Sequence, residues 1–265
     1  NQHQTNGPCL MCLILVAYRA HADYPLVVAA NRDEFHARPT APAAFWDEYP
    51  DIFAGRDLQA GGTWMGISRA GRFAAITNYR DPQATAPAPR TRGELTANYL
   101  AGNQRAETYL QSLARCANEY AGFNLLLGEA GELWYFSNST ADHAPRKLDP
   151  GLYGLSNARL DTPWPKVLRG KQALQNQIHS APSHQGLASV VSSRELAPPE
   201  HLRAQGLEGE MDQMLSAQFI VNPTYGTRAT TTLWQEADGT LQLREMNFSP
   251  AGHTEAVIEQ SLTPA

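Results

Sequence analysis

Two short stretches carry residue types that suit nucleophilic chemistry. Cys12 begins one apolar run, and the cluster Asn31, Arg32, Asp33 closes the next. A thiol attacks as the thiolate, so it needs a base to take its proton and a positive neighbour to stabilise the charge. Taken alone, Cys12 fits an inert core residue, because cysteine is among the most buried residue types. The cluster alone fits an ion-paired turn.

Together, the two stretches predict a β-hairpin. Residues 11–19 and 25–31 are short apolar runs rich in β-branched side chains, and a polar turn separates them. A hairpin returns the end of its second strand to the start of its first. The charged cluster is therefore expected beside Cys12.

Each member of the cluster then has a candidate role. Arg32 would stabilise a thiolate or a bound anionic group, because its guanidinium is permanently charged. Asp33 would orient the base, and Asn31 would fix the turn or donate to substrate. If translation starts at Met11 and that residue is removed, Cys12 carries an α-amino group with a pKa of about 7.7–8.0. Nucleophile and base would then be one residue.

The sequence as written departs from that arrangement. Residues 1–11 precede Cys12 and form an N-terminal extension: a tag, a propeptide or a misassigned start. Residues 12–265 are predicted to be a single domain. With the extension attached, the Cys12 nitrogen is an amide and cannot act as a base. Cys9 and Cys12 have the spacing of a redox motif, but no thioredoxin-like βαβ pattern surrounds them.

Composition narrows the class of protein. The chain has 265 residues, a formal net charge of -5 and three cysteines. This charge gives no electrostatic footprint for nucleic acid, and no apolar run approaches the ~20 residues of a transmembrane helix. The N-terminus lacks the basic and apolar regions of a secretory signal, so a cytoplasmic location is expected. An odd, small number of cysteines argues against a disulfide framework.

The order of elements predicts an α+β fold. Strands come mostly as adjacent hairpins, and two helical blocks, residues 104–122 and 161–181, lie between them. Asn103 is the expected N-cap of the first block, and Pro163 lies near the start of the second. Strands that are apolar on both faces need cover on each side. We therefore expect a four-layer αββα sandwich of antiparallel sheets.

Two other segments are expected to lack regular structure. Residues 36–53 contain Pro, Trp and Tyr and suggest a surface loop over a cleft, and residues 81–93 suggest a Pro/Ala linker. The linker is too short to divide the chain into domains.

Several ordered motifs resemble one known family. They are MCLI, NRDEF, AGRDLQAGGTWMGISRAGRFAAITNYR, GFNLLLG, YGLSNARLDTPWPKV and YGTRATTTL. They look like the NRDE family, also called the transport and Golgi organisation protein family, from Met11 to about Phe248. This family in turn resembles N-terminal-nucleophile hydrolases of the choloylglycine hydrolase and penicillin acylase type. Those enzymes share an αββα sandwich and cleave non-peptide amide bonds with an N-terminal cysteine.

The resemblance implies site residues. Cys12, Arg32 and Asp33 match the nucleophile, arginine and aspartate of those hydrolases. An asparagine at a strand end commonly donates to the oxyanion there, and Asn157 is favoured over Asn78 for this role. Both asparagines also fit plain turn residues.

Two further residues are expected around the substrate. Arg228 in the YGTR motif would help to shape the pocket. Trp64 follows Gly61 and Gly62, a pair that suggests a close backbone approach in the pocket wall, although a turn or bulge explains it as well. A protein-interaction module that exposes Trp64 is a weaker interpretation.

Two functions remain open from the sequence. The first is cleavage of an amide or thioester bond in a small acyl substrate, without a cofactor. The second is haem binding or haem trafficking without catalysis, to which the family has been linked. Cys12, the eight histidines or the five methionines would then supply an axial ligand, and Phe45, Trp46 and Tyr49 would cover the ring. The histidines show no zinc-ligand spacing, so no metal site is expected.

Overall fold

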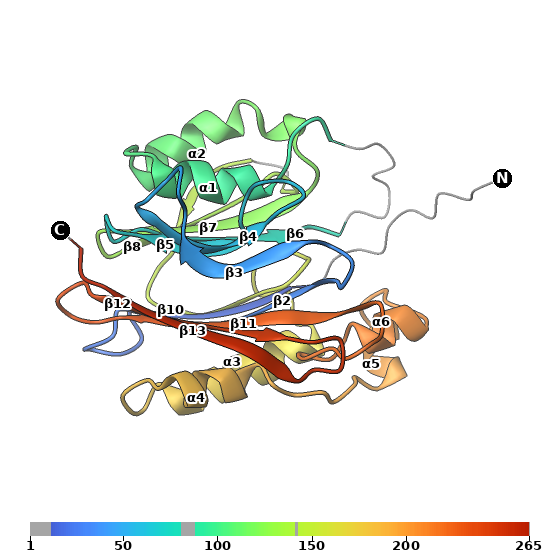
Figure 1. Ribbon diagram of the computed structural model, residues 1–265. Helices are drawn as coiled ribbons and strands as arrows, with labels where there is room; N and C mark the ends of the chain where they lie inside the picture. The colour runs from blue at the N-terminus through green and yellow to red at the C-terminus, as the bar shows by residue number, and fades with distance from the viewer. Residues whose placement is uncertain (1–11, 81–87, 141–142, 265) are drawn as a thin grey trace.

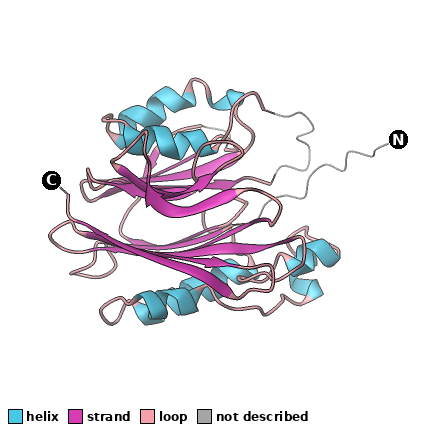
Figure 2. Cartoon of the chain, viewed as in Figure 1, coloured by secondary structure: helices cyan, strands magenta, loops and turns pink. Residues whose placement is uncertain are grey.

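Two antiparallel sheets lie face to face, and helices cover the outer face of each (Figures 1 and 2). The computed structural model describes residues 12–80, 88–140 and 143–264. The predicted α+β class and αββα layering are confirmed. The expected N-terminal extension, residues 1–11, and much of the expected linker, residues 81–87, lie outside the described residues.

The first sheet, sheet A, has six strands and contains both strands of the predicted hairpin. In spatial order they are β10 (Gly151–Leu155), β1 (Leu13–Tyr18), β2 (Leu26–Phe35), β11 (Tyr225–Gln235), β12 (Leu241–Phe248) and β13 (Thr254–Leu262). Sheet B follows the chain order of its seven strands: β3 (Thr40–Phe45), β4 (Ile52–Asp57), β5 (Met65–Ser68), β6 (Phe73–Asn78), β7 (Phe123–Glu129), β8 (Glu132–Ser137) and β9 (Arg146–Lys147).

The helices divide between the two outer layers (Figure 1). Sheet B carries α1 (Gly93–Ala101), α2 (Ala106–Ala114) and the short 3₁₀ turn η1 (Ala117–Glu119). Below sheet A lie α3 (Pro165–Gln177), α4 (His184–Val190), α5 (Pro199–Arg203) and α6 (Glu210–Met214). In the part of the chain that the structure describes, no helix is both long and apolar enough to cross a membrane.

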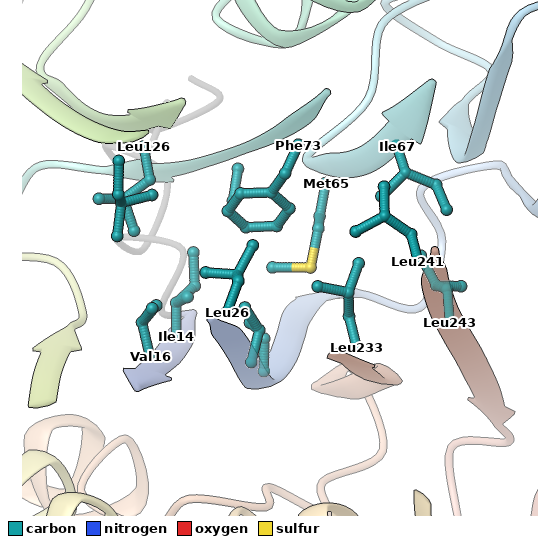
Figure 3. Close-up of a cluster of buried hydrophobic side chains, with 14 of the residues drawn as sticks. Ile14, Val16, Leu26, Met65, Ile67, Phe73, Leu126, Leu233, Leu241 and Leu243 are labelled. Carbon is teal, nitrogen blue, oxygen red and sulfur yellow. The ribbon is translucent and has the colours of Figure 1, made fainter. Parts of the chain in front are cut away.

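Three apolar clusters hold these layers together. The central cluster fills the space between the sheets, and Figure 3 shows Ile14, Leu126 and Leu233 meeting there from different strands. The other two clusters pack each sheet against its helices. Strand β2 contributes side chains to two of the three clusters, because alternate side chains of a strand point to opposite faces. Val28 belongs to the central cluster and Val27 to the helix side.

Strand β2 is longer than predicted. The charged cluster was expected to form a turn after residue 31, but the strand continues to Phe35. The physical reason is a second partner, β11, far along the chain, which pairs Asp33 with Thr227 and Arg32 with Ala229. A β-bulge between Thr227 and Ala229 marks this stretch. The cluster is therefore held as rigidly as the core strand that it extends.

Other expectations about local structure were wrong. Residues 36–53 contain strand β3 and the start of β4, and Pro42 lies where the register between these strands shifts, a position that tolerates proline. Helix α1 occupies a segment with no predicted helix. Helix α2 begins after Arg105, so Asn103 is not its N-cap, and Pro165, not Pro163, starts α3.

Candidate active site

Cys12 lies immediately before β1, at the edge of the space between the sheets. Leu13 pairs with Asn31 across the β1–β2 hairpin, so Cys12 comes next to Arg32. The hairpin prediction is confirmed, and with it the closeness of Cys12 to the charged cluster. Cys12 is 8% exposed and lines a cleft of about 290 Å³.

Asn157 holds the main chain of Cys12. Its Oδ1 accepts a hydrogen bond from the Cys12 nitrogen at 3.1 Å, and its Nδ2 donates to the Asn78 carbonyl at 2.9 Å. These two partners fix the orientation of the amide, since one is a donor and the other an acceptor. The Ser156 hydroxyl donates to the Cys12 carbonyl at 2.7 Å. Because Asn78 ends β6, this network ties sheet A to sheet B beside the thiol.

The thiol of Cys12 is held in its neutral form. Burial, followed by the negative charge of Asp33, raises the pKa of Cys12 to about 12. A hydrogen bond from the Asp33 main-chain N–H and the positive charge of Arg32 oppose this rise. At pH 7 only about one thiol in 10⁵ would ionise on its own. Attack by this sulfur therefore needs a base that removes the proton as the new bond forms.

Asp33 is a buried carboxyl, 1% exposed. Its Oδ1 accepts a hydrogen bond from the Thr227 hydroxyl at 2.6 Å, and its Oδ2 has no hydrogen-bond partner within the described residues. Burial raises the pKa of Asp33 to about 7, against the influence of Lys166, the Thr227 hydroxyl and Arg32. The group therefore titrates near neutral pH, the range that suits a residue involved in proton transfer.

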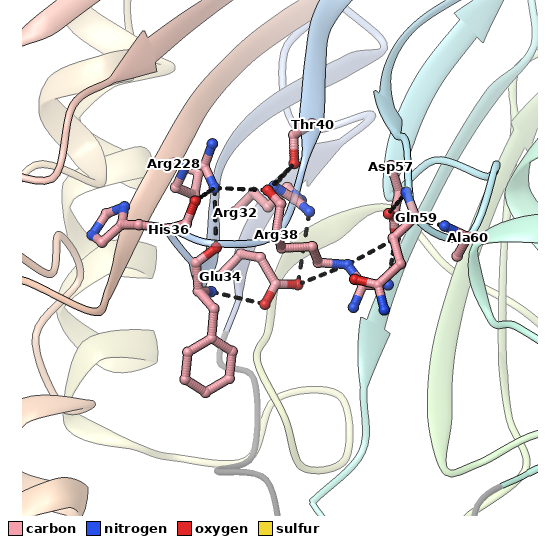
Figure 4. Close-up of polar contacts among 10 residues, drawn as sticks. Arg32, Glu34, His36, Arg38, Thr40, Asp57, Gln59, Ala60 and Arg228 are labelled. Carbon is pink, nitrogen blue, oxygen red and sulfur yellow. Dashed lines mark hydrogen bonds and ion pairs between the residues drawn. The ribbon is translucent and has the colours of Figure 1, made fainter.

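A chain of ion pairs connects charged residues that line the cleft (Figure 4). The Glu34 carboxylate lies between Arg32, at 3.7 Å, and Arg38, at 3.6 Å. Arg38 continues the chain to Asp57, with Nη2 to Oδ2 at 2.6 Å, and Arg32 also donates to the Thr40 hydroxyl. Arg32 and Glu34 are both buried, so their charges are poorly screened by water. This network links β2 in sheet A to the strands of sheet B.

The cleft brings together five of the eight residues that the sequence suggested for the site. They are Cys12, Arg32, Asp33, Trp64 and Asn78. The described lining does not include Asn31, Asn157 or Arg228. The side-chain amide of Asn78 makes no hydrogen bond with the described part of the chain, whereas that of Asn157 is engaged on both sides.

Asn31 and Arg228 support the site from outside the cleft. The Asn31 amide donates to the carbonyls of Val191 and Gln218 and accepts from Thr230, so it joins β2 to the helix layer. Arg228 donates to three carbonyls at the end of β2 and in the turn after it, those of Phe35, His36 and Arg38 (Figure 4).

The double glycine works as expected. A Cβ placed on Gly62 would lie 2.3 Å from the carbonyl carbon of Gly93, so no other residue fits there. The Thr63 nitrogen donates to the Gly93 carbonyl at 3.1 Å. This contact seats the start of α1 against the loop before β5, and Thr63 and Gly93 both line the cleft.

Other residues of the site were missed by sequence reasoning. Arg38, Asp57, Ser156 and Thr227 were given no role, and Glu34 appeared only as part of the NRDEF motif. Their signal was present, because Asp57, Ser156 and Thr227 lie inside the quoted motifs. Their partners, however, come from distant segments.

Features of a metal or haem site are sparse. Within residues 12–80, 88–140 and 143–264, no group of three or more His, Cys, Asp or Glu side chains could hold a metal ion. The described lining of the cleft contains neither His nor Met. Trp46 is buried and donates to the Ala54 carbonyl, and Phe45 packs edge-on against Phe53.

The model of the family described as Transport and Golgi organisation 2 matches residues 11–250. This chain belongs to that family. The sequence resemblance to the transport and Golgi organisation proteins is thereby confirmed.

Relatives in the family are similar along most of their length. The Transport and Golgi organization protein 2 homologs of Bos taurus and Homo sapiens are each 36% identical to this chain, over 85% of it and 87% of their own length. The Transport and Golgi organization protein 2 of Drosophila melanogaster is 29% identical over 62% of this chain and 64% of its own.

Solved structures show a distant likeness. An N-acylethanolamine-hydrolyzing acid amidase ortholog from Caenorhabditis elegans has 10% identity and a TM-score of 0.43, covering 84% of this chain and 92% of its own. Penicillin V acylase from Agrobacterium tumefaciens has 11% identity and a TM-score of 0.39, covering 94% of this chain and 90% of its own.

Proposed function

We propose that this family member cleaves an amide or thioester bond of a small acyl substrate, with Cys12 as the nucleophile. The observation that carries this proposal is the position of Cys12. Cys12 lines a cleft together with Arg32 and Asp33, while Asn157 and Ser156 fix its main-chain nitrogen and carbonyl. Because the main chain is fixed on both sides of the α-carbon, little conformational entropy is lost when the nucleophile reaches the reactive geometry.

The base in this proposal is the α-amine of Cys12 in a chain that begins at this residue. In the first step the sulfur bonds to the substrate carbonyl carbon, and the thiol proton passes to the amine. The carbonyl oxygen becomes an oxyanion. Asn78 is the better placed donor to it, because Asn78 lines the cleft while the Asn157 amide is engaged by Cys12 and Asn78.

The second half of the reaction releases the acyl group. The bond from the carbonyl carbon to the leaving nitrogen or sulfur breaks, and the leaving group takes the proton from the ammonium of Cys12. Water then attacks the thioester that remains on Cys12 and gives its proton to the amine. The carboxylic acid departs and the thiol is restored, so water is the only co-reactant.

The arginines of the cleft offer hydrogen-bond donors to an anionic group of a substrate, although Arg56 and Arg90 also pair with carboxylates outside the lining. Among the described residues, five arginines and three acidic residues line the cleft; the acidic residues are Asp33, Glu34 and Asp57. The lining arginines are Arg32, Arg38, Arg56, Arg90 and Arg92. Guanidinium groups bind carboxylates and phosphates through paired hydrogen bonds. Binding of such a substrate should weaken as salt concentration rises.

Haem is the less favoured occupant of the cleft. Cys12 is the one soft ligand in the described lining, and thiolate ligation would require ionising a thiol whose pKa is raised to about 12. The volume of about 290 Å³ lies at the small end of the range for ligand pockets, roughly 300–1,000 Å³. Haem trafficking therefore stays an alternative that titration with haemin would test.

The test is an intact-mass measurement on a chain that begins at Cys12, before and after incubation with an electrophilic acyl probe. One adduct per chain is expected, and it should be absent in Cys12→Ala. Cys116, which is partly buried, provides an internal comparison. An adduct on Cys116 but none on Cys12 would overturn the proposal.

A further inference from the structure

Lys166 is a buried lysine to which the proposed mechanism gives no role. It lies in the first turn of α3, inside the motif DTPWPKV, and is 1% exposed. Lysine is almost never fully buried without a partner for its charge, since an isolated ammonium in the interior costs several kcal/mol. Its environment should therefore contain a group that benefits from a positive charge.

Helix α3 packs closely enough on sheet A to bring Lys166 under the site. A Cβ on Gly170 would lie 2.4 Å from Leu15 of β1, and one on Gly154 of β10 would lie 2.5 Å from Val167. A side chain at either position would therefore force Leu15 or Val167 to move. The ridge of α3 that carries Lys166 is thereby seated against the strand that follows Cys12.

A short hydrogen-bond path links Lys166 to the strand that bears Asp33. The Gln218 side chain donates to the Lys166 carbonyl at 3.1 Å, and the Gln218 carbonyl accepts from the Asn31 amide at 2.7 Å. Asn31 and Asp33 share a face of β2, because side chains two residues apart point the same way. Asp33 therefore lies on the face of β2 that meets the helix layer, the layer to which Lys166 belongs.

We propose that Lys166 is a positioning residue that favours the ionised form of the Asp33 carboxyl at the cleft. Burial of Asp33 disfavours its charge, and its Oδ2 has no hydrogen-bond partner within the described residues. The ammonium of Lys166 is the first among the influences that lower the pKa of Asp33, ahead of the Thr227 hydroxyl and Arg32. The inference rests on the proposed function, in which Asp33 orients the base.

Other charged groups around the pair come from three elements. Arg32 neighbours Asp33 on β2, and the Cys12 thiol lies before β1. Asp212 on α6 lines the same small cavity as Lys166, but its carboxylate is bound by Arg80 at 2.6 Å. Asp33, by contrast, makes no ion pair within 4 Å with the described residues, and Lys166 acts on it electrostatically.

The consequence for stability has a definite sign. The pKa of Asp33 is about 7 in the folded chain, against an ordinary value of 3.8. The folded state therefore binds more protons than the unfolded state between these values, and stability falls as pH rises through this range. Removing the Lys166 charge should raise the pKa further, so the fall should extend to higher pH.

The experiment is a double-mutant cycle of Lys166→Met and Asp33→Asn in the full chain, by urea unfolding at pH 5.5 and pH 8.5. At pH 8.5 we expect the two changes to be coupled by at least about tenfold in the unfolding constant. At pH 5.5, where Asp33 is protonated with or without Lys166, the coupling should largely vanish. Lys166→Arg keeps the charge and should retain more coupling than Lys166→Met.

The controls separate charge from packing. Lys171 lies on the same helix, and its ammonium pairs with Asp161 at 2.7 Å. Lys171→Met should show no pH-dependent coupling to Asp33→Asn. Lys166→Gln is a second neutral variant should Lys166→Met fail to fold. Coupling that is equal at both pH values, or absent at both, would overturn the inference.

This test is independent of the proposed function. Unfolding constants need neither a substrate nor a reactive thiol, so the cycle gives its answer even if Cys12 takes up no acyl probe. Conversely, a Cys12 adduct without coupling between Lys166 and Asp33 would leave the nucleophile in place and remove the role of Lys166.

Discussion

The side-chain oxygen of Asn157 accepts a hydrogen bond from the main-chain nitrogen of Cys12 at 3.1 Å, across 145 positions of sequence. In a chain that begins at Cys12, this bond would hold the α-amine that serves as the base in the proposed mechanism. It holds the nitrogen of Cys12, whether amide or amine, at the junction of the two sheets. Both the reactivity of the thiol and the stability of the fold should depend on it.

The first prediction concerns the residue before Cys12. A chain that begins at Cys12 should react with an acyl probe about 10²-fold faster than one that retains Met11, because only the free amine can take the thiol proton. Time courses of intact mass measure both rates. The rate at Cys116 should be the same in the two chains. Equal rates at Cys12 would show that the amine is not the base.

The second prediction is that Asp33→Asn changes the reactivity of Cys12 in opposite directions in chains with and without Met11. In a chain that retains Met11, Asp33→Asn should speed alkylation of Cys12 several-fold, because the charge of Asp33 raises the thiol pKa. In a chain that begins at Cys12, the same change should slow acylation, because the amine loses its orienting carboxylate. Iodoacetamide and an acyl probe measure the two rates. A change in the same direction in both chains would contradict this account.

The third prediction is the pH dependence of stability. The folded chain should lose stability as pH rises from about 4 to about 7, because burial raises the pKa of Asp33 to about 7. Three pKa units correspond to at most about 4 kcal/mol. Asp33→Asn should flatten this part of the profile, measured by urea unfolding at half-unit steps of pH. Thr227→Val removes a hydrogen bond that lowers the pKa of Asp33, so in this variant the fall should extend to higher pH.

The fourth prediction compares the two side chains that hold Cys12. Asn157→Ala leaves a buried N–H of Cys12 and a carbonyl of Asn78 without partners, and should cost about 2–3 kcal/mol of unfolding free energy. Ser156→Ala removes one bond to the Cys12 carbonyl and should cost about 1 kcal/mol. Urea unfolding of the two variants decides this. A larger loss for Ser156→Ala would mean that Asn157 is not the main tie between the sheets.

The fifth prediction concerns the ion pairs of the cleft. Glu34→Gln removes the carboxylate between Arg32 and Arg38, and should cost about 2–3 kcal/mol because Arg32 is buried and loses its countercharge. Glu48→Gln is the matched control, since Glu48 pairs with Arg56 but is exposed. Its effect should lie within experimental error. If both variants lost a similar amount of unfolding free energy, the Glu34 ion pairs would contribute no more to stability than an ordinary surface ion pair.

Local patterns were enough to predict part of this site. Cys12 and Arg32 come together through a hairpin whose two strands are close in sequence, and the apolar runs on both faces indicated the layering. Asp238-Gly239, a pair typical of hairpin turns, likewise lies between β11 and β12, and the Thr240 nitrogen donates to Asp238 there. Turn residues and hydrophobic periodicity are enough to predict pairing between strands that are close in sequence.

Long-range pairing could not be predicted in the same way. Strand β2 extends through Asp33 because β11 pairs with this stretch. No residue near Asp33 in the sequence indicates that β11 is the partner. Strand β3 contains Pro42, which suggests a loop unless the edge and the register shift are known. Helix α1 depends on the contact of Gly62 with Gly93. In each case tertiary contacts override local propensity.

The ten-residue strand β2 serves the core with its first half and the cleft with its second. Because side chains alternate, the length of the strand is as constrained as its composition. Deleting one residue between Leu26 and Ala30 would exchange the two faces downstream. Arg32 and Glu34 would then point at the helices, and Asn31 and Asp33 at the opposite sheet. Substitutions in the apolar half of β2 should therefore be tolerated far better than insertions or deletions of a single residue. Insertions or deletions of two residues keep each downstream side chain on its own face of the sheet.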